Sequence, residues 1–355
     1  MHNYKNNKVL NNLIQMIGYI LSPIVFLLIY IFFNFLNIPF LSISLLCIVV
    51  GLIIGQLYKN KINILEGINF TTKYILQIGI IFLGIRLSFI DLLNFGKVAL
   101  PIVILVFLII FILRYIFIIK YNSLSQKNII TLISIGTAVC GITAIMAASP
   151  FIKAKENEIS YATITISIIG MISLISYPFI GFEIFEDNFK QVGLFLGSSI
   201  HDTSQVIASS MIYSSLFNND QVIDVAIVTK LLRNSFLIIL LPYLAISYSS
   251  INTNSHLQNI KNGFPLFLIG FLFFSVIRTS GDYYFLNSIN ETWNFLIHLT
   301  EQLSFIFINI ALVSLGISTN IIDIKKIGFK TFFIGFVFSL VLFGINFLVI
   351  KNFIS

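Results

Sequence analysis

The chain has 355 residues, of which 57% are hydrophobic and only 10% are charged. Soluble domains contain roughly a quarter charged residues, so this composition excludes a water-soluble globular protein. The net charge of +7 does not indicate nucleic-acid binding, because the cations are scattered between apolar runs in the manner of cytoplasmic loops.

Nine apolar runs are long enough, alone or with their flanks, to cross a bilayer, which needs about 20 residues per helix. The first run exceeds the roughly 7 to 15 residues of a signal-peptide core, so we expect it to be retained as a helix. The predicted spans are residues 13–33, 38–57, 74–89, 98–119, 159–180, 222–246, 264–277, 293–315 and 328–350.

Two further segments, residues 129–151 and 192–216, are apolar at their ends and polar or rich in glycine in the middle. Backbone can leave the helix at membrane depth only where protein or a water-filled cavity satisfies its polar groups. We therefore predict two broken or re-entrant helices. The expected fold is an all-α polytopic membrane protein with about nine full spans and these two segments, forming one transporter domain over residues 1–355.

The basic residues predict the orientation of the chain, because cytoplasmic loops are enriched in lysine and arginine. If segment 129–151 returns to the side it entered, Lys153 and Lys155 lie inside and Glu186 outside, whereas full spans would put both lysines outside. We prefer the hairpin. A cytoplasmic N-terminus places the earlier cations on one side: Lys5, Lys8, Lys59, Lys61, Lys73, Arg114, Lys120 and Lys127.

The sequence also contains internal echoes. The Leu-Gly-Ile motif at 83–85, followed by Asp91 and Gly96, recurs at 315–317, followed by Asp323 and Gly328. A weaker echo pairs residues 136–141 with 197–202. In the charge-derived topology the two members of each pair enter from opposite sides, which is typical of inverted-repeat transporters. The predicted halves are residues 37–181 and 190–352, with chance similarity in an apolar background as the alternative.

The densest polar cluster in an apolar context is the stretch from Gly197 to Gln205. Ionisable groups at membrane depth cost roughly 2.5 to 3.5 kcal/mol each on insertion scales and are functional candidates. His201, whose ordinary pKa is about 6.5, and Asp202 are therefore predicted to couple transport to protons. The alternative for Asp202 is to cap the helix that follows. The substrate-binding candidates here are Ser198, Ser199, His201, Asp202 and Gln205.

The matching segment contains Gly136, Thr137, Cys140 and Gly141. A turn followed by a helix directs free backbone N–H groups at its surroundings, an arrangement that suits an anion. Close packing through small residues is the alternative for the glycines.

Lys230 and Arg233, three residues apart, share one face of an apolar helix. We predict that they bind an oxyanion, which suits the planar fork of arginine. The alternative for such cations is that their long side chains reach the membrane interface.

Several chemistries lack support in the sequence. It contains no G-x-x-x-x-G-K-[ST] motif and no metal-ligand spacing, so we expect no cofactor, no metal and no ATP-driven pumping. Cys47 and Cys140 lie within apolar stretches and give no disulfide framework.

Five runs of sequence resemble one known family when taken in order. They are GIIFLGIRLSF, GTAVCGITAIMAASPFIKAKENE, GSSIHDTSQV, VTKLLRN and ALVSLGIST. Together they resemble the bacterial YeiH-like family, for some of whose members sulfate export is inferred, and the match extends from about Gly51 to Gly344. The resemblance implies an inner-membrane protein distantly similar to cation–proton antiporters and anion transporters. It marks Gly136, Thr137, Cys140, Gly141, His201, Asp202, Gln205, Lys230 and Arg233, with Asp202 where the family often has Glu.

These observations predict a secondary transporter, not an enzyme, that exports a small anion by alternating access. The resemblance implies sulfate or a related oxyanion. The expected partners are that anion and membrane lipid, without nucleic acid, and a homo-oligomer stays open. The alternatives are a cation–proton antiporter that uses Asp202 and an intramembrane enzyme that uses His201 with Asp202. Lys230 and Arg233 favour the anion, because cations beside a site repel a cation.

Overall fold

The computed structural model describes residues 2–36, 43–57, 64–120, 124–186, 188–247, 267–285, 291–319 and 329–353. Within these ranges the chain forms helices and connecting turns, without a β-strand. Seven helical stretches in these ranges are long and apolar enough to cross a bilayer. They are Met16–Phe33, Leu65–Arg86, Phe89–Lys120, Glu156–Phe185, Gln221–Leu244, Glu291–Ser318 and Lys330–Asn352.

The predicted count of nine spans is not confirmed. Helix α2 (Ile43–Leu57) has 15 residues, or about 22 Å, against a hydrocarbon core of about 30 Å. Helix α14 (Phe267–Tyr284) carries Arg278 and Asp282 toward its end, and neither helix is among the seven candidate spans. Lys59, Lys61, Asp323 and Gly328 lie outside the described residues.

The chain divides into two compact units, and each of them combines segments from both ends of the sequence. The first unit consists of Met1–Asp91 and Leu266–Ile321, and the second of Leu92–Pro265 and Ile322–Ser355. The units therefore do not coincide with the predicted repeat halves, 37–181 and 190–352. The inverted repeat stays a prediction.

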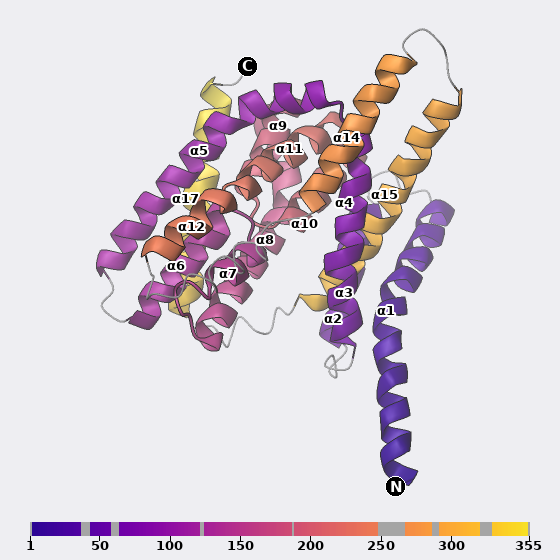
Figure 1. Ribbon diagram of the computed structural model, residues 1–355, viewed down its shortest axis with the longest axis horizontal. Helices are drawn as coiled ribbons and strands as arrows, with labels where there is room; N and C mark the ends of the chain where they lie inside the picture. The colour runs from indigo at the N-terminus through magenta and orange to yellow at the C-terminus, as the bar shows by residue number, and fades with distance from the viewer. Residues whose placement is uncertain are drawn as a thin grey trace. The chain divides into compact units, whose positions relative to one another are not determined.

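In the first unit, α15 (Glu291–Ser318) packs along α2 and along α4 (Leu76–Leu83), and α14 packs on α4. Helix α1 (His2–Leu36) packs on α3 (Leu65–Phe70), which continues through a π-helical turn, Thr71–Ile75, into α4 (Figure 1). The buried Ser44 hydroxyl donates to Asn309 Oδ1 at 2.9 Å, which joins α2 to α15. A short 3-10 turn, Gly84–Arg86, ends this run of helices.

In the second unit, α17 (Phe329–Phe353) packs against α6 (Leu124–Ala138), α8 (Glu156–Phe185) and α9 (Phe189–Ser199). Helix α11 (Gln221–Ser235) packs against α9 and α10 (Thr203–Phe217) and leads into α12 (Leu237–Ser247). The long α5 (Phe89–Lys120) contacts α17 through the rings of Phe117 and Phe338, whose centroids are 5.4 Å apart, and α6 through a hydrogen bond from Arg114 to the Thr131 hydroxyl (Figure 1).

Both segments that the sequence marks as irregular are broken. Helix α6 ends at Ala138 and α7 (Ile142–Ala148) follows, while α9 ends at Ser199 and α10 begins at Thr203. The first break turns at Gly141, whose φ of 63° and ψ of −127° suit glycine because a side chain would be strained there. Whether the segments are hairpins or full spans stays a prediction.

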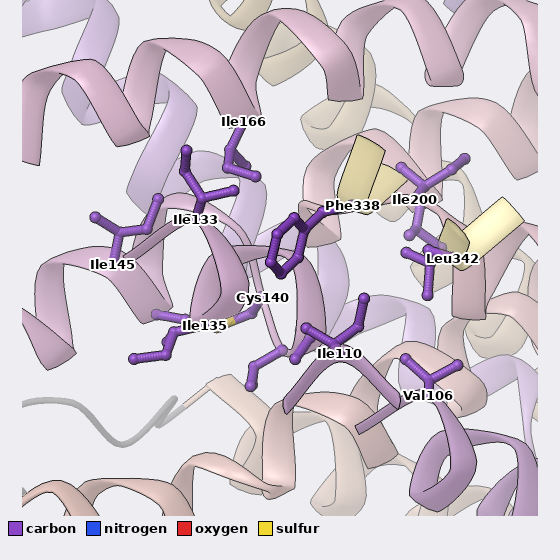
Figure 2. Close-up of a cluster of buried hydrophobic side chains, with 14 of the residues drawn as sticks. Val106, Ile110, Ile133, Ile135, Cys140, Ile145, Ile166, Ile200, Phe338 and Leu342 are labelled. Carbon is purple, nitrogen blue, oxygen red and sulfur yellow. The ribbon is translucent and has the colours of Figure 1, made fainter. Parts of the chain in front are cut away.

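The two breaks lie in the apolar interior of the second unit. Cys140 from the first break and Ile200 from the second are buried in one hydrophobic cluster with Phe338 and Leu342 of α17 (Figure 2). Because this surrounding is apolar, the backbone groups freed by the breaks need partners from within the protein.

Candidate functional site

The last carbonyl groups of α6 and α9 have no partner within their own helices, as at every helix end. In this unit they point to α11, which supplies Lys230 and Arg233. Both side chains are 0% exposed. Helix α11 can approach α9 closely because α9 contains glycine, and a Cβ on Gly197 would lie 2.5 Å from the carbonyl oxygen of Ala226.

The guanidinium of Arg233 joins both breaks. Its Nε donates to the carbonyl of Ala138, and its Nη2 donates to that of Thr137, at the end of α6. On the other side Nη1 lies within hydrogen-bond distance of the carbonyls at the end of α9, at 3.2 Å from Gly197, 2.7 Å from Ser198 and 2.9 Å from Ile200. The planar fork of arginine is suited to such an arrangement, because its donors point in fixed directions.

The ammonium of Lys230, one turn earlier on α11, also joins both breaks. It donates to the carbonyls of Val139 and Ile200, each at 3.0 Å, and to that of His201. Three acceptors require three hydrogens, which only the protonated ammonium carries, so the geometry fits a charged lysine. We call the hydrogen bonds from Lys230 and Arg233 to these carbonyls the carbonyl clamp. Helix C-termini carry partial negative charge, and the clamp therefore sets two cations against two negative helix ends.

The clamp gives the two cations a role besides the predicted one, and their binding of an oxyanion stays a prediction. They lie together with Thr137 and His201, as the sequence indicates, and they are buried, so they do not extend to the interface. Their donors, however, bond to backbone carbonyls. In this arrangement Lys230 and Arg233 position the breaks.

Asp202 is the N-cap of α10, in agreement with the second of the two roles that the sequence allows for it. Its Oδ1 accepts from the Ser204 amide at 2.9 Å and from the Ser204 hydroxyl at 2.6 Å. The Asp202 amide in turn donates to Gln205 Oε1 at 3.3 Å, which completes a capping box. A Cβ on Gly141 would lie 3.2 Å from Asp202 Oδ2, so the two breaks are adjacent.

The remaining predicted residues lie in the same region with structural contacts. The Ser198 hydroxyl donates to Leu194 of its own helix at 2.6 Å, and the Ser199 hydroxyl accepts from Asn346 Nδ2 at 3.0 Å. The Gly136 carbonyl accepts from the Gly141 amide at 2.9 Å. Cys140 is a buried free thiol.

Three buried side chains at the clamp keep polar atoms without a hydrogen-bond partner among the described residues. They are both ring nitrogens of His201, Thr137 Oγ1 and Asn234 Oδ1. Sequence reasoning missed Asn234, although an Asn directly after Arg233 in an apolar helix is itself a signal. A buried polar group without a partner costs about 1–3 kcal/mol, so these atoms mark where a ligand would be stabilised.

The charged side chains described at the two breaks are Lys230, Arg233 and Asp202, which leave one positive charge in excess. Buried Glu158 accepts from Asn128 Nδ2 at 2.9 Å, and Asn128 lies roughly 13 Å along α6 from Thr137. Because Glu158 contacts Asn128 near the start of α6, its carboxylate lies too far from Thr137 and the clamp to balance the charge there. The described residues contain no group of His, Cys, Asp and Glu side chains that could hold a metal ion.

Comparison with known proteins gives matches over most of the chain. A family model described as "Conserved hypothetical protein 698" matches residues 17–335. A UPF0324 membrane protein of Fusobacterium nucleatum is 31% identical over 81% of this chain and 84% of its own length. UPF0324 membrane proteins of Streptococcus agalactiae and Clostridium tetani are 29% and 27% identical, over 84% and 89% of this chain and 87% and 91% of their own lengths. No solved structure matches.

These names and the apolar helices together establish a multi-pass membrane protein. The names of these three relatives mention neither sulfate nor a YeiH-like exporter. Sulfate export and the likeness to transporter folds therefore stay predictions.

Proposed function

We propose that this chain, which belongs to the family described as conserved hypothetical protein 698, with UPF0324 membrane proteins as its relatives, is a secondary transporter for a small anion. The observation that carries the proposal is the meeting of two broken helices at the carbonyl clamp. Transport proceeds by alternating access, and export across the inner membrane with a cytoplasmic N-terminus is the direction and setting that we propose.

Broken helices support transport because they place backbone polar groups and helix ends in an apolar interior. Secondary transporters form their solute sites from such discontinuous helices near the bilayer midplane. Here the polar groups come from two separate helices, α6 with α7 and α9 with α10, which are joined through α11.

The charges at the clamp support an anion. Two buried cations against one carboxylate leave a positive excess that an anion can neutralise, and electrostatic interactions are strong where water is excluded. A cation would meet a single carboxylate that already uses one oxygen to cap α10, with both cations nearby. The cation–proton antiporter is therefore the second candidate, favoured only by the partial exposure of Asp202. We propose neither a chemical reaction nor a cofactor.

The test uses the purified full-length protein in proteoliposomes. Labelled small anions and, in parallel, sodium are offered to protein-containing and protein-free vesicles, and the recovered label is checked for chemical change. We expect saturable uptake of an unchanged anion. A recovered product that differs from the added solute would indicate an enzyme instead.

Asp202→Asn separates the two transport proposals, because asparagine also caps helices well but has no charge. With both sides at the same pH, anion uptake should persist in this variant. Sodium uptake by the parent protein that is lost in Asp202→Asn would overturn the anion proposal in favour of the antiporter.

A further inference from the structure

The polar atoms without partners at the clamp are connected to it through their own backbone or through a neighbour. The Thr137 carbonyl accepts from Arg233, and the His201 carbonyl accepts from Lys230. Asn234 follows Arg233, and its Nδ2 donates to the Thr203 hydroxyl at 3.1 Å. The clamp thus holds the carbonyls of Thr137 and His201, and Asn234 follows Arg233 on α11. All three side chains are buried and keep polar atoms without a described partner.

The hydrogen-bonding capacity of these side chains restricts the ligand. A neutral imidazole has one donor and one acceptor, and a threonine hydroxyl can do both. Asn234 Oδ1 can only accept, because the amide nitrogen is engaged with Thr203. We treat His201 as neutral, since a third cation beside Lys230 and Arg233 would be repelled by both. A matching ligand must therefore supply at least one hydrogen as well as lone pairs.

The charge at the clamp restricts the ligand further. One excess positive charge is balanced by a monovalent anion, whereas a dianion would leave a negative charge unbalanced in an apolar interior. Fully deprotonated sulfate meets neither requirement, because it is divalent and has no hydrogen to donate.

We infer that the transported solute is a monovalent oxyanion that keeps a hydroxyl hydrogen, and that His201, Thr137 and Asn234 contact it. This class includes hydrogencarbonate, hydrogensulfite and dihydrogenphosphate. The inference rests on the proposed transport function and departs from the sulfate that the sequence resemblance implies.

Three tetrahedral anions of similar shape separate the requirement for a single negative charge from the requirement for a hydrogen. Their binding to the purified full-length protein is measured by calorimetry at mildly acidic pH. Phosphate is then mainly a monoanion with hydroxyl hydrogens, perchlorate is a monoanion without one, and sulfate is a dianion without one. We expect phosphate to bind at least about tenfold more tightly than the other two, as one additional hydrogen bond would give. Sulfate or perchlorate binding as tightly as phosphate would overturn the inference.

Variants test which side chains make the contact. His201→Leu should weaken phosphate binding by about tenfold or more without lowering the melting temperature, because the ring nitrogens bond to no described residue. His201→Gln, which again offers a donor and an acceptor, should recover part of the affinity. Parent-like binding by His201→Leu, or a large loss of stability, would assign His201 a structural role instead.

Thr137→Val and Ser134→Ala form a matched pair on α6, because both remove a buried hydroxyl. The Ser134 hydroxyl donates to the carbonyl of Thr131 in its own helix, whereas that of Thr137 has no described partner. Only Thr137→Val should weaken phosphate binding, and equal effects would contradict the assignment. Asn234→Asp adds a carboxylate that cancels the excess charge, and it should abolish binding.

Proteoliposome flux distinguishes a failure of the proposed transport function from a failure of the inference about the class of solute. If phosphate, sulfate and perchlorate all fail to bind and no labelled anion is taken up, the proposed function fails. If anion uptake is saturable but prefers sulfate, only the present inference fails.

Discussion

Replacing Arg233 by methionine tests the carbonyl clamp most directly. Methionine keeps an unbranched, apolar stem of similar length but removes the guanidinium from five backbone carbonyls at the ends of α6 and α9. Each carbonyl left unpaired in an apolar interior costs about 1–3 kcal/mol. Some of them regain partners by local shifts, so we take the cost as about 3–5 kcal/mol, which is typical when one partner of a buried charged contact is removed.

This cost predicts a measurable loss of thermal stability. For a unit of roughly 200 residues, 1 kcal/mol corresponds to about 2–4 °C, so Arg233→Met should lower the melting temperature by about 10 °C. Cys140 is a suitable probe because it lies in the first break and is 4% exposed. In a Cys47→Ala background, a thiol-reactive dye would follow the exposure of Cys140 on heating.

Arg278→Met is the matched control, because Arg278 is 27% exposed, pairs with Asp282 on the same helix and donates to one backbone carbonyl, that of Ile85, at 3.3 Å. Such a surface pair contributes about 1 kcal/mol or less, so this variant should melt near the parent. Arg233→Lys, which keeps the charge but not the fork, should fall between the two. If Arg233→Met melts with the Arg278 control, the clamp does not hold the breaks together.

The other predictions concern the backbone, the cap and the topology. Gly141→Ala should destabilise the protein by about 1–3 kcal/mol, because its positive φ strains a side chain; Gly344→Ala, where an added Cβ meets nothing within 4 Å, should not, and equal thermal melts would contradict this. Gln205→Leu should cost about 0.5–2 kcal/mol by removing the acceptor of the Asp202 amide, which denaturant titration can measure against Gln302→Leu, a change at an exposed glutamine on α15. In a cysteine-free background, Glu186→Cys should be labelled from outside the cell and Lys155→Cys only from inside, while the reverse labelling would favour full spans.

Much of the fold could be predicted from the sequence because membrane spans depend on the length of apolar runs. Seven of the nine predicted spans correspond to candidate spans. The two breaks were predictable because glycine and polar residues interrupt otherwise apolar segments, and the structure places them at residues 139–141 and 200–202. The division into two units was not, because it depends on packing between helices that are far apart in the sequence.

The hydrogen-bond partners of the site residues could not be predicted from the sequence. The spacing of Lys230 and Arg233 correctly puts both on one face of a helix, but their acceptors are backbone carbonyls up to 96 residues away. Asp202 before α10 fits both a cap and a proton carrier, and only the bonds to Ser204 show that it caps. Asn234 matters because Thr203 engages one end of its amide and leaves the other end without a described partner.

The clamp also has a consequence for the order of biosynthesis. A ribosome completes α6 well before it reaches Arg233, the residue whose guanidinium satisfies the last carbonyls of that helix. Until α11 emerges, the first break has no clamp, and an apolar bilayer offers its carbonyls no replacement. Nascent chains that stop before α11 should therefore keep the first break near water or bound to the insertion machinery. Its final burial is an event that occurs late in synthesis, when the second break and α11 arrive together.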